Sequence, residues 1–398
     1  MILTIKLSYM DKIEELLTRG VEDVIDKEHL SKALRSKKKL RVKLGIDPTS
    51  PNIHIGRAVV LWKLRAFQEL GHKVIFIVGD FTGIIGDTSD KEAERQMMSE
   101  AEIKKNIKTY FAQAYKILDK KNSETHYNSK WLKKLNFKQV GELANLFGMH
   151  EFEARENIAK RLKQGKRVSV RELLYPLMQG YDSVAVKADV ELGGTDQKFN
   201  LLAGRKIQKA FGQEPQDIMT TSLMAGMDGR KMSSSWGNVI NITDEPNNMF
   251  GKVMSVDDGL IKKYFVLATR TPFSEIDRIM KELQNPRDQK LILAQSITSL
   301  YHGAKKAAQA KENFIKQFTN KELPDHIEEK KISPPRTYKL SELLKLAGLA
   351  GSKGEARRLI EQKGVKVKGV VSTDVDIALD GKKEYLLQVG KRKFLKVK

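Results

Sequence analysis

Two short segments carry a lysine, three consecutive serines and a histidine that could together bind a triphosphate. Residues 226–235 form a glycine-flanked loop with Lys231 near its centre, followed by Ser233, Ser234 and Ser235. Residues 51–57, about 175 positions upstream, hold His54 in a turn that is predicted to enter a helix. A cationic loop and a helix N-terminus can hold one phosphate chain from two sides, so the pair predicts a nucleotide site.

The turn at His54 has the residue types that phosphate binding needs. Gly56 leaves room for a ribose or base to approach the backbone, and His54 can donate a hydrogen bond while neutral. Alone, this segment is equally compatible with a structural turn, and the Lys231 segment with a flexible surface loop. Their combination favours a loop that closes over a nucleotide and reopens.

Two further groups of polar and charged residues stand at helical spacing. Asp87 is followed by Lys91 and Arg95, which share a face if the segment is helical, although a charged helix start would look the same. Tyr175, Gln179 and Asp182 stand at i, i+4 and i+7, on one helix face. The plain alternative is a core tyrosine and a helix-end charge.

Apolar runs and helical spacing predict the elements that position these residues. A strand at 40–46, a helix at 56–70 and an apolar strand at 73–79 make a βαβ unit. We also expect a leading helix within 11–35, a long helix at about 92–119, a strand near 184–190 and a helix at 195–211. The alternation predicts an α/β domain on a parallel sheet, with ligands at the carboxyl ends of the strands.

Charge and composition bound the class of protein. The 398 residues carry a formal net charge of +22, which fits a lysine-rich proteome or a polyanionic partner such as nucleic acid. The absence of cysteine excludes disulfides, thiolate metal sites and cysteine nucleophiles. No apolar run of about 18 residues and no signal-peptide pattern are visible, so we expect a cytoplasmic protein without a membrane span.

The last 62 residues are predicted to form a separate basic module. Residues 337–398 hold 15 lysines and arginines and 7 acidic residues, a net charge of +8, after a polar linker with three prolines. A helix at 353–362 would display Arg357 and Arg358. An apolar framework favours a folded module over a solvated charged tail.

Taken together, these segments resemble the tyrosyl branch of the class I aminoacyl-tRNA synthetases, over roughly residues 36–398. Residues 51–57 and 231–235 match the HIGH and KMSKS signatures in order and separation, and 174–182 match the amino-acid-binding helix. The resemblance implies a Rossmann-like parallel-sheet catalytic domain at 1–225, an α-helical anticodon-binding domain with the signature loop at 226–318, a linker at 319–336 and a small α+β S4-like RNA-binding domain at 337–398.

The resemblance also implies roles for individual residues. Catalysis by charge and positioning would fall to His54, Arg57, Lys91, Arg95, Lys231 and Ser234. ATP would be bound by Asp47, Thr49, His54, Gly56, Gly194, Asp196, Lys231 and Ser234. Tyrosine would be bound by Lys43, Asp87, Tyr175, Gln179, Asp182 and Gln197. The tRNA would contact Lys353, Arg357, Arg358 and Lys363.

The implied activity is ligation of tyrosine to tRNA(Tyr). ATP would convert tyrosine to tyrosyl-adenylate and pyrophosphate, with Mg²⁺ accompanying ATP and no metal held by the protein, and tyrosine would then pass to the tRNA. A homodimer is expected by resemblance. Asp182 would accept a hydrogen bond from the phenol and so reject phenylalanine, a discrimination for which tyrosyl enzymes are a known example. A tryptophanyl-type synthetase and a non-catalytic RNA-binding synthetase paralogue are the alternatives.

Three residues depart from the family pattern. Arg57 replaces the last histidine of the first signature and keeps a donor with permanent charge. Ser234 replaces a lysine of the second signature, so that Lys231 must carry more of the charge. Lys43 stands where many bacterial members have a phenol-contacting tyrosine, and it could pair with an acid such as Asp80, contact the phenol or point to solvent.

Overall fold

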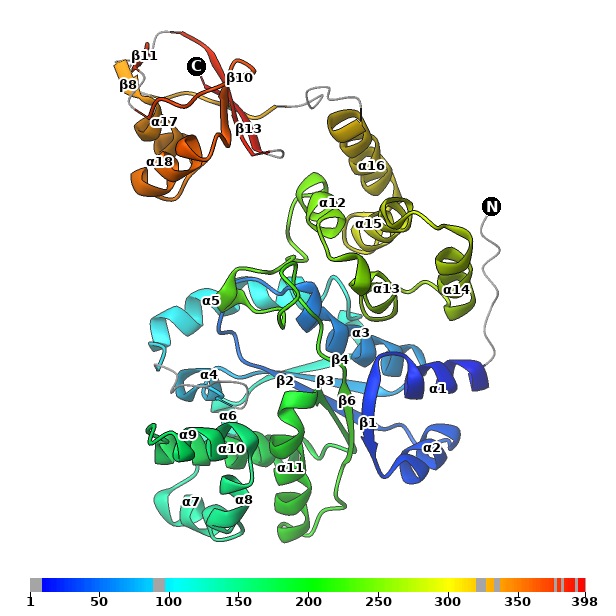
Figure 1. Cartoon of the computed structure of the whole chain (residues 1–398). Helices are drawn as coiled ribbons and strands as arrows, with labels where there is room; N and C mark the ends of the chain where they lie inside the picture. The colour runs from blue at the N-terminus through cyan, green and yellow to red at the C-terminus, as the bar shows by residue number, and fades with distance from the viewer. Residues whose placement is uncertain are drawn as a thin grey trace. The chain divides into compact units, whose positions relative to one another are not determined.

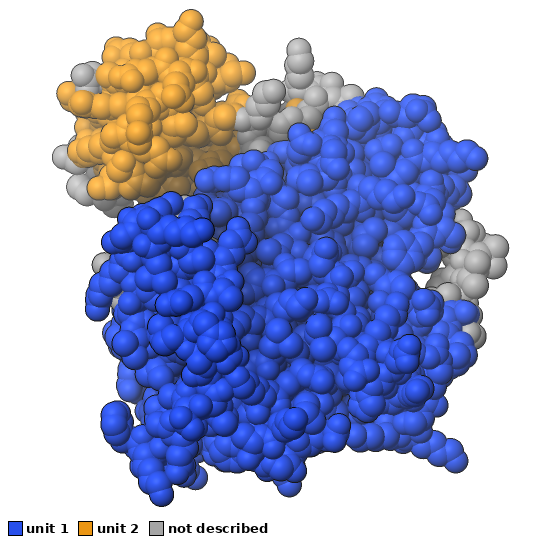
Figure 2. All heavy atoms as spheres, turned by 60° about the horizontal axis from the view of Figure 1, so that its bottom comes forward, with its two compact units in different colours: residues 1–245, 252–304 blue, residues 246–251, 305–398 orange. Residues whose placement is uncertain are grey.

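The computed structural model of the chain describes residues 9–88, 97–319, 327–332, 337–375, 378–380, 383–390 and 393–397. Contacts divide the chain into two compact units, residues 1–245 with 252–304 and residues 246–251 with 305–398, coloured blue and orange in Figure 2. Lys91 and Arg95 lie outside the described residues. The domain boundaries implied by the resemblance stay a prediction.

A six-stranded sheet forms the centre of the first unit (Figure 1). Its strands are β1 (Val21–Ile25), β2 (Arg41–Ile46), β3 (Lys73–Val78), β4 (Ser123–Tyr127), β5 (Val190–Gly194) and β6 (Asp217–Thr221). The spatial order is β1-β6-β5-β2-β3-β4, and every neighbouring pair is parallel except β1 with β6. The strand order reverses between β2 and β5, the place where open α/β sheets bind their ligands.

Helices cover both faces of this sheet. In Figure 1, α3 (Ile55–Glu69) lies above the sheet, and α10 (Val170–Val186) and α11 (Lys198–Ala210) lie below it. This double cover explains why the run from Val74 to Val78 is fully buried and apolar at every position. The predicted α/β class with a parallel sheet is therefore confirmed. The strands predicted at 40–46 and 73–79 and the helix between them are also confirmed, as β2, β3 and α3.

Two sequence expectations about elements were wrong. The leading helix within 11–35 is two helices separated by β1, because Gly20, at φ +61°, turns the chain into a strand at the sheet edge. The strand placed near 184–190 begins only at Val190, because α10 continues to Val186 and ends at Lys187, which is in the left-handed conformation. The apolar residues Val184 and Val186 belong to the buried face of that helix.

The remaining helices of the first unit complete its layers. They are α1 (Tyr9–Thr18), α2 (Lys27–Arg35), α4 (Thr82–Ile85), α5 (Glu100–Ala114), α6 (Ser129–Leu132), α7 (Phe137–Ala144), α8 (Met149–Glu153), α9 (Glu156–Lys163), α13 (Ile261–Ala268), α14 (Phe273–Glu282) and α15 (Pro286–His302). None of the helices in the described part of the chain is both long enough and apolar enough to cross a membrane.

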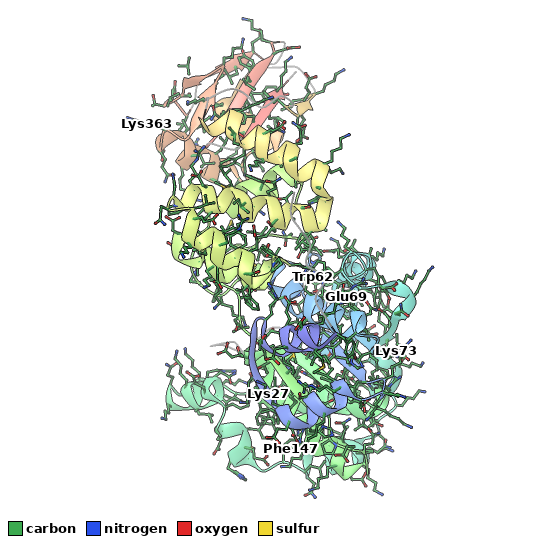
Figure 3. The ribbon with its side chains drawn as sticks, turned by 90° about the vertical axis from the view of Figure 1, so that its right-hand side faces the viewer. Lys27, Trp62, Glu69, Lys73, Phe147 and Lys363 are labelled. Carbon is green, nitrogen blue, oxygen red and sulfur yellow. The ribbon has the colours of Figure 1, made fainter. Side chains whose placement is uncertain are left out.

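The helices after the Lys231 loop are fastened to α3. Trp62 Nε1 donates to the hydroxyl of Tyr301 at 3.1 Å. The guanidinium of Arg270 pairs with both oxygens of Glu69, at 2.8 and 2.6 Å, and lies 5.3 Å from the centre of the Trp62 ring. Trp62 and Glu69 are labelled on this helix in Figure 3. The helices after the Lys231 loop therefore stabilise the position of α3, the helix that His54 caps.

The second unit contains a folded C-terminal module. Its elements are α12 (Pro246–Met254, the first six residues of which belong to this unit), α16 (Ala304–Thr319), β7 (Glu329–Lys330), β8 (Thr337–Lys339), α17 (Leu340–Ala347), α18 (Lys353–Glu361), β9 (Val365–Val367), β10 (Val370–Val371), β11 (Ala378–Asp380), β12 (Tyr385–Val389) and β13 (Lys393–Val397). The five-stranded sheet has the order β10-β9-β12-β13-β7. Leu344, Ile360 and Leu387 are fully buried between helices and sheet, so this segment is not a solvated tail.

Candidate functional site

A cleft of about 890 Å³ opens in the first unit beside the carboxyl ends of β2 and β5. Its size suits a nucleotide together with an amino acid. The predicted residues that line it are Asp47, Thr49, His54, Gly56, Arg57, Asp87, Tyr175, Gln179, Asp182, Gly194, Asp196, Gln197, Lys231 and Ser234. Of the described residues predicted to bind substrate in this cleft, Lys43 is the one that does not line it.

Backbone hydrogen bonds join the two distant signature segments directly. Ile55 N donates to Ile240 O at 2.8 Å, and Ile242 N donates to Ile53 O at 2.9 Å, across a bridge between His54 and Asn241. The chain that follows the Lys231 loop is thus bonded to the turn at His54. The convergence expected from the spacing of the two motifs is present in the fold.

His54 caps helix α3 and is held neutral. Its Nδ1 accepts from Arg57 N at 3.3 Å, so the neutral ring carries its proton on Nε2 and can donate from there. Burial, then the charges of Arg57 and Lys231, lower the pKa of His54 to about 3. The residue therefore offers a hydrogen bond to a phosphate without a charge of its own at neutral pH.

The loop around Lys231 is ordered by its own polar contacts. Asn238 donates to Asp228 at 2.7 Å and accepts from Ser233 N at 2.8 Å, while Arg230 pairs with Asp228 at 2.5 Å. Lys231 Nζ lies 2.8 Å from Asp196 Oδ2, a carboxylate at the end of β5. The lysine charge is thus already at the cleft, next to the residue that the family resemblance links to the ribose.

The two signature departures are both accommodated at the cleft. Arg57 donates from Nη1 to the hydroxyl of Tyr110 at 2.6 Å and from Nη2 to Thr49 Oγ1 at 3.0 Å. Ser234 Oγ lies 3.3 Å from Ser50 Oγ. The arginine is therefore oriented by neighbours, and the serine adds a hydroxyl where the family pattern has a charge.

Two hydrogen bonds hold polar side chains in place inside the cleft. Tyr175 donates to Asp47 Oδ2 at 2.9 Å, and Gln197 Nε2 donates to Asp87 Oδ2 at 2.6 Å. Burial and the nearby Asp47 hold the pKa of Tyr175 well above its usual range, so it stays a donor. These carboxylates lie where a substrate ammonium could be bound.

Gly79 is a requirement that the sequence did not reveal. It follows β3, and a Cβ there would lie 2.0 Å from Asp47 Oδ1 and 2.2 Å from Thr82 Oγ1. Thr82 donates to the same carboxylate oxygen at 2.7 Å. Only a residue without a side chain lets Asp47 reach its place in the cleft.

Asp182 lies at the buried end of the cleft. Its Oδ1 accepts from Trp131 Nε1 at 2.7 Å and its Oδ2 from Asn128 Nδ2 at 3.2 Å. Burial raises the pKa of this carboxyl to about 7, against the lowering effect of Lys43 and of the two hydrogen bonds. A carboxylate with two donors fixed on it still has lone pairs for a third, such as a phenol.

Lys43 pairs with an acid, as one of the alternatives expected, but the partner is Glu191 and the side chain does not line the cleft. It is fully buried, its ammonium lies 2.9 Å from Glu191 Oε1, and it does not point to solvent. It does not pair with Asp80 either, which instead accepts from Ser129 N at 2.9 Å. The sheet register explains the pairing, because Lys43 on β2 stands beside Glu191 on β5.

Sequence reasoning missed Asn128, Trp131 and Glu191. The first two belong to the turn after β4 and to α6, and no motif marks them. Glu191 could have been found from its pairing with Lys43, but the strand that holds it was placed too early in the sequence. No group of three histidines, aspartates or glutamates in the described residues could hold a metal ion.

The four residues expected to contact tRNA lie on or just beyond one helix of the C-terminal module, α18. Ser352 caps the N-terminus of α18 by accepting a hydrogen bond from Glu355 N at 3.1 Å, and so fixes where the helix begins. Arg357 and Arg358 are exposed on it, as are Lys353 at its start and Lys363 just beyond its end. Lys363 is labelled in Figure 3. Their exposure leaves these charges accessible to a polyanion.

Comparisons with known proteins find a matching family model and relatives of similar sequence. A family model described as class I tRNA synthetases (W and Y) matches residues 35–319. The chain is 47% identical over 388 residues to a tyrosine–tRNA ligase from Thermotoga maritima, covering 96% of each chain. It is 43% identical over 397 residues to one from Coxiella burnetii, covering 98% of this chain and 99% of the relative.

A solved structure matches the fold. A tyrosyl-tRNA synthetase from Archaeoglobus fulgidus complexed with L-tyrosine has a TM-score of 0.62 and 22% sequence identity. The match covers 75% of this chain and 99% of that chain. At this identity the likeness concerns the fold alone, and it supports the arrangement of sheet and helices around the cleft.

Proposed function

The chain belongs to the class I tRNA synthetases of the tryptophan and tyrosine type, and we propose that the described cleft is where it activates tyrosine for ligation to tRNA. Relatives that are 43–47% identical over nearly the whole chain are tyrosine–tRNA ligases, so this chain is an enzyme of that activity. The main observation in support is that residues of both signature segments and the buried carboxylate of Asp182 line the same cleft.

In the first step the tyrosine carboxylate attacks the α-phosphorus of ATP. A bond from a carboxylate oxygen to phosphorus forms as the bond from phosphorus to the bridging oxygen breaks, and pyrophosphate leaves. The protein supplies no nucleophile, so it acts by positioning and by stabilising charge. We propose that His54, Arg57 and Lys231 stabilise the negative charge that develops on the phosphates. Lys91 and Arg95 are proposed to help stabilise it as well.

The amino-acid end of the cleft orients the substrate. Asp87, Tyr175, Gln179 and Gln197 would hold the ammonium and carboxylate of tyrosine, and Asp182 would accept from its phenol. The ATP ribose and base would lie along Asp47, Thr49, Gly56, Gly194 and Asp196. We expect Mg²⁺ to arrive on the ATP phosphates, since the ion commonly binds substrate phosphates and keeps several waters.

Asp182 favours tyrosine over tryptophan as the substrate. A buried carboxylate needs a donor that is aligned with its remaining lone pairs, and the hydroxyl of tyrosine supplies one at the end of the ring. Purified protein incubated with ATP, tRNA and either amino acid should form tyrosyl-tRNA far faster than tryptophanyl-tRNA. Preferential charging with tryptophan would contradict the proposal.

The C-terminal module is proposed to be an S4-like domain that binds tRNA(Tyr). Arg357 and Arg358 would contact the phosphate backbone of the tRNA, and these contacts would depend on charge and weaken as the salt concentration rises. Replacing both by alanine should raise the KM for tRNA about tenfold while leaving tyrosine-dependent pyrophosphate exchange unchanged. The matched variant, Lys339→Ala at the end of β8 with Lys345→Ala on α17, removes the same charge from the same module. An equal effect of both variants, or loss of exchange, would exclude a specific contact at α18.

A homodimer is proposed from exposed apolar side chains of the first unit. Phe137 is 92% exposed, Val170 72% and Met149 57%, and they belong to helices α7, α10 and α8. These helices pack around one small core, with residues such as Phe152 inside it. Exposed apolar surface of this kind suits a self-complementary contact with a second copy. Sedimentation velocity at micromolar concentration should give a dimer, and a monomer would contradict it.

A further inference from the structure

A closed polar network lies behind the amino-acid end of the cleft. The ammonium of Lys43 has three donors, and three acceptors surround it: Glu191 Oε1 at 2.9 Å, Ser183 Oγ at 2.7 Å and Gln179 O at 2.9 Å. Glu191 in turn accepts from Gln179 Nε2 at 3.1 Å, from Ser183 Oγ at 3.0 Å and from Gln216 Nε2. Lys43 and Glu191 are both fully buried.

The surrounding fold leaves room for this network. Gly204 on α11 faces it, and a Cβ there would lie 2.5 Å from Gln216 Nε2 and 3.3 Å from Glu191 Oε2. A buried ion pair is weak support for stability, because apolar residues of similar volume often stabilise a core equally well. Stability alone therefore does not explain a charged pair at this place.

The network fixes the orientation of Gln179, which lines the cleft. A carboxylate can only accept, so the amide of Gln179 must turn its nitrogen toward Glu191. The amide oxygen then remains for a donor in the cleft, and an ammonium group is such a donor. Without Glu191, the amide could present either end to the substrate.

The network also sets the charge around Asp182, one residue before Ser183 on α10. Lys43 on β2 favours the ionised carboxylate and Glu191 on β5 opposes it, with Lys43 the larger influence. Trp131 and Asn128 donate to Asp182 from α6 and the turn before it, and Tyr175 faces it from its own helix. Removing both members of the pair should therefore raise the pKa of Asp182.

We propose that Lys43 and Glu191 are positioning residues for tyrosine, which orient Gln179 toward the substrate ammonium and keep Asp182 charged for the phenol. They act through these two side chains and do not touch the substrate. The inference rests on the proposed function of the cleft. It assigns the unusual lysine on β2 to recognition of tyrosine from behind the binding surface.

The test uses the double variant Lys43→Met with Glu191→Met, which removes the pair and leaves no buried charge without a partner. In pyrophosphate exchange, the KM for tyrosine should rise about tenfold or more, with kcat at saturating tyrosine nearly unchanged. The preference for tyrosine over phenylalanine should fall by a similar factor. The double variant Arg41→Met with Glu124→Met is the control, since it removes an ion pair from the same strand but away from the cleft lining.

The pH dependence separates positioning from a structural role. In the unmodified chain, kcat/KM for tyrosine should fall as the pH drops below about 7, where Asp182 becomes protonated, while kcat/KM for phenylalanine changes little. In the Lys43/Glu191 variant this acidic limb of the pH profile, where kcat/KM for tyrosine falls, should move to higher pH. An unchanged limb and an unchanged preference, in a variant with the melting temperature of the unmodified chain, would overturn the proposal.

Glu191→Gln, which keeps size and shape, covers the case in which the double variant does not fold. Its tyrosine KM should also rise, because the glutamine no longer dictates the orientation of Gln179. If neither variant folds, the pair serves folding itself and the positioning role is rejected. If the unmodified chain shows no tyrosine-dependent exchange at all, the proposed function fails first, which is a distinct result.

Discussion

Replacing Lys231 by alanine should slow formation of tyrosyl-adenylate by about 10²–10³-fold, the usual cost of removing one preorganised group that stabilises transition-state charge. The Kd for tyrosine should change by less than about twofold. The reason is that negative charge builds up on the departing pyrophosphate only as the reaction proceeds, so a group that meets this charge lowers kcat more than it affects binding. Ser234 offers a hydroxyl but no charge to compensate for the lost lysine.

The measurement is single-turnover adenylate formation, with tyrosine affinity taken from equilibrium binding. Lys262→Ala is a suitable control, since that lysine also forms an ion pair, with Asp277 at 2.8 Å, on the surface of α13. It should leave both quantities unchanged. Equal losses in rate and in tyrosine binding for Lys231→Ala would show that the lysine stabilises the ground state as much as the transition state, and its proposed role would be wrong.

Replacing Asp182 by asparagine should lower kcat/KM for tyrosine about 100-fold or more. Asparagine has one acceptor oxygen, whereas the aspartate accepts from both Trp131 and Asn128 and still has lone pairs for the phenol. The new amide nitrogen must face one of these donors. The substrate hydroxyl then loses its partner, or displaces one that the fold needs.

Phenylalanine serves as the internal control for Asp182→Asn, since it makes no bond to the carboxylate. Its kcat/KM should change by only a few-fold, so the ratio of the two substrates isolates the hydroxyl contact. A parallel fall for both amino acids would mean that the variant has damaged the cleft in general. In that case Asp182 would not be the residue that recognises the phenol.

The sequence was sufficient to locate most of the cleft. Two motifs about 175 residues apart predicted a shared site, and the bridge between His54 and Asn241 brings them together. The helical spacing of Tyr175, Gln179 and Asp182 correctly predicted that they share one face. These predictions succeeded because each depends on residue types at fixed local spacing, which the fold preserves.

Other parts of the site could not be predicted because they depend on which strands become neighbours. Lys43 and Glu191 are 148 positions apart, and only the register of β2 with β5 places them side by side. Asp182 depends on Trp131 and Asn128, which reach it from beyond β4. The sequence also placed β5 too early in the chain. Val184 and Val186 look like strand residues, but they are apolar because they lie on the buried face of α10.

The most direct test is ATP–pyrophosphate exchange by the purified protein with each of the twenty amino acids in turn. We expect exchange with tyrosine, far weaker exchange with phenylalanine and tryptophan, and background rates with the others. Exchange that depends on a different amino acid, or no exchange with any of them, would contradict the claim that this cleft makes tyrosyl-adenylate.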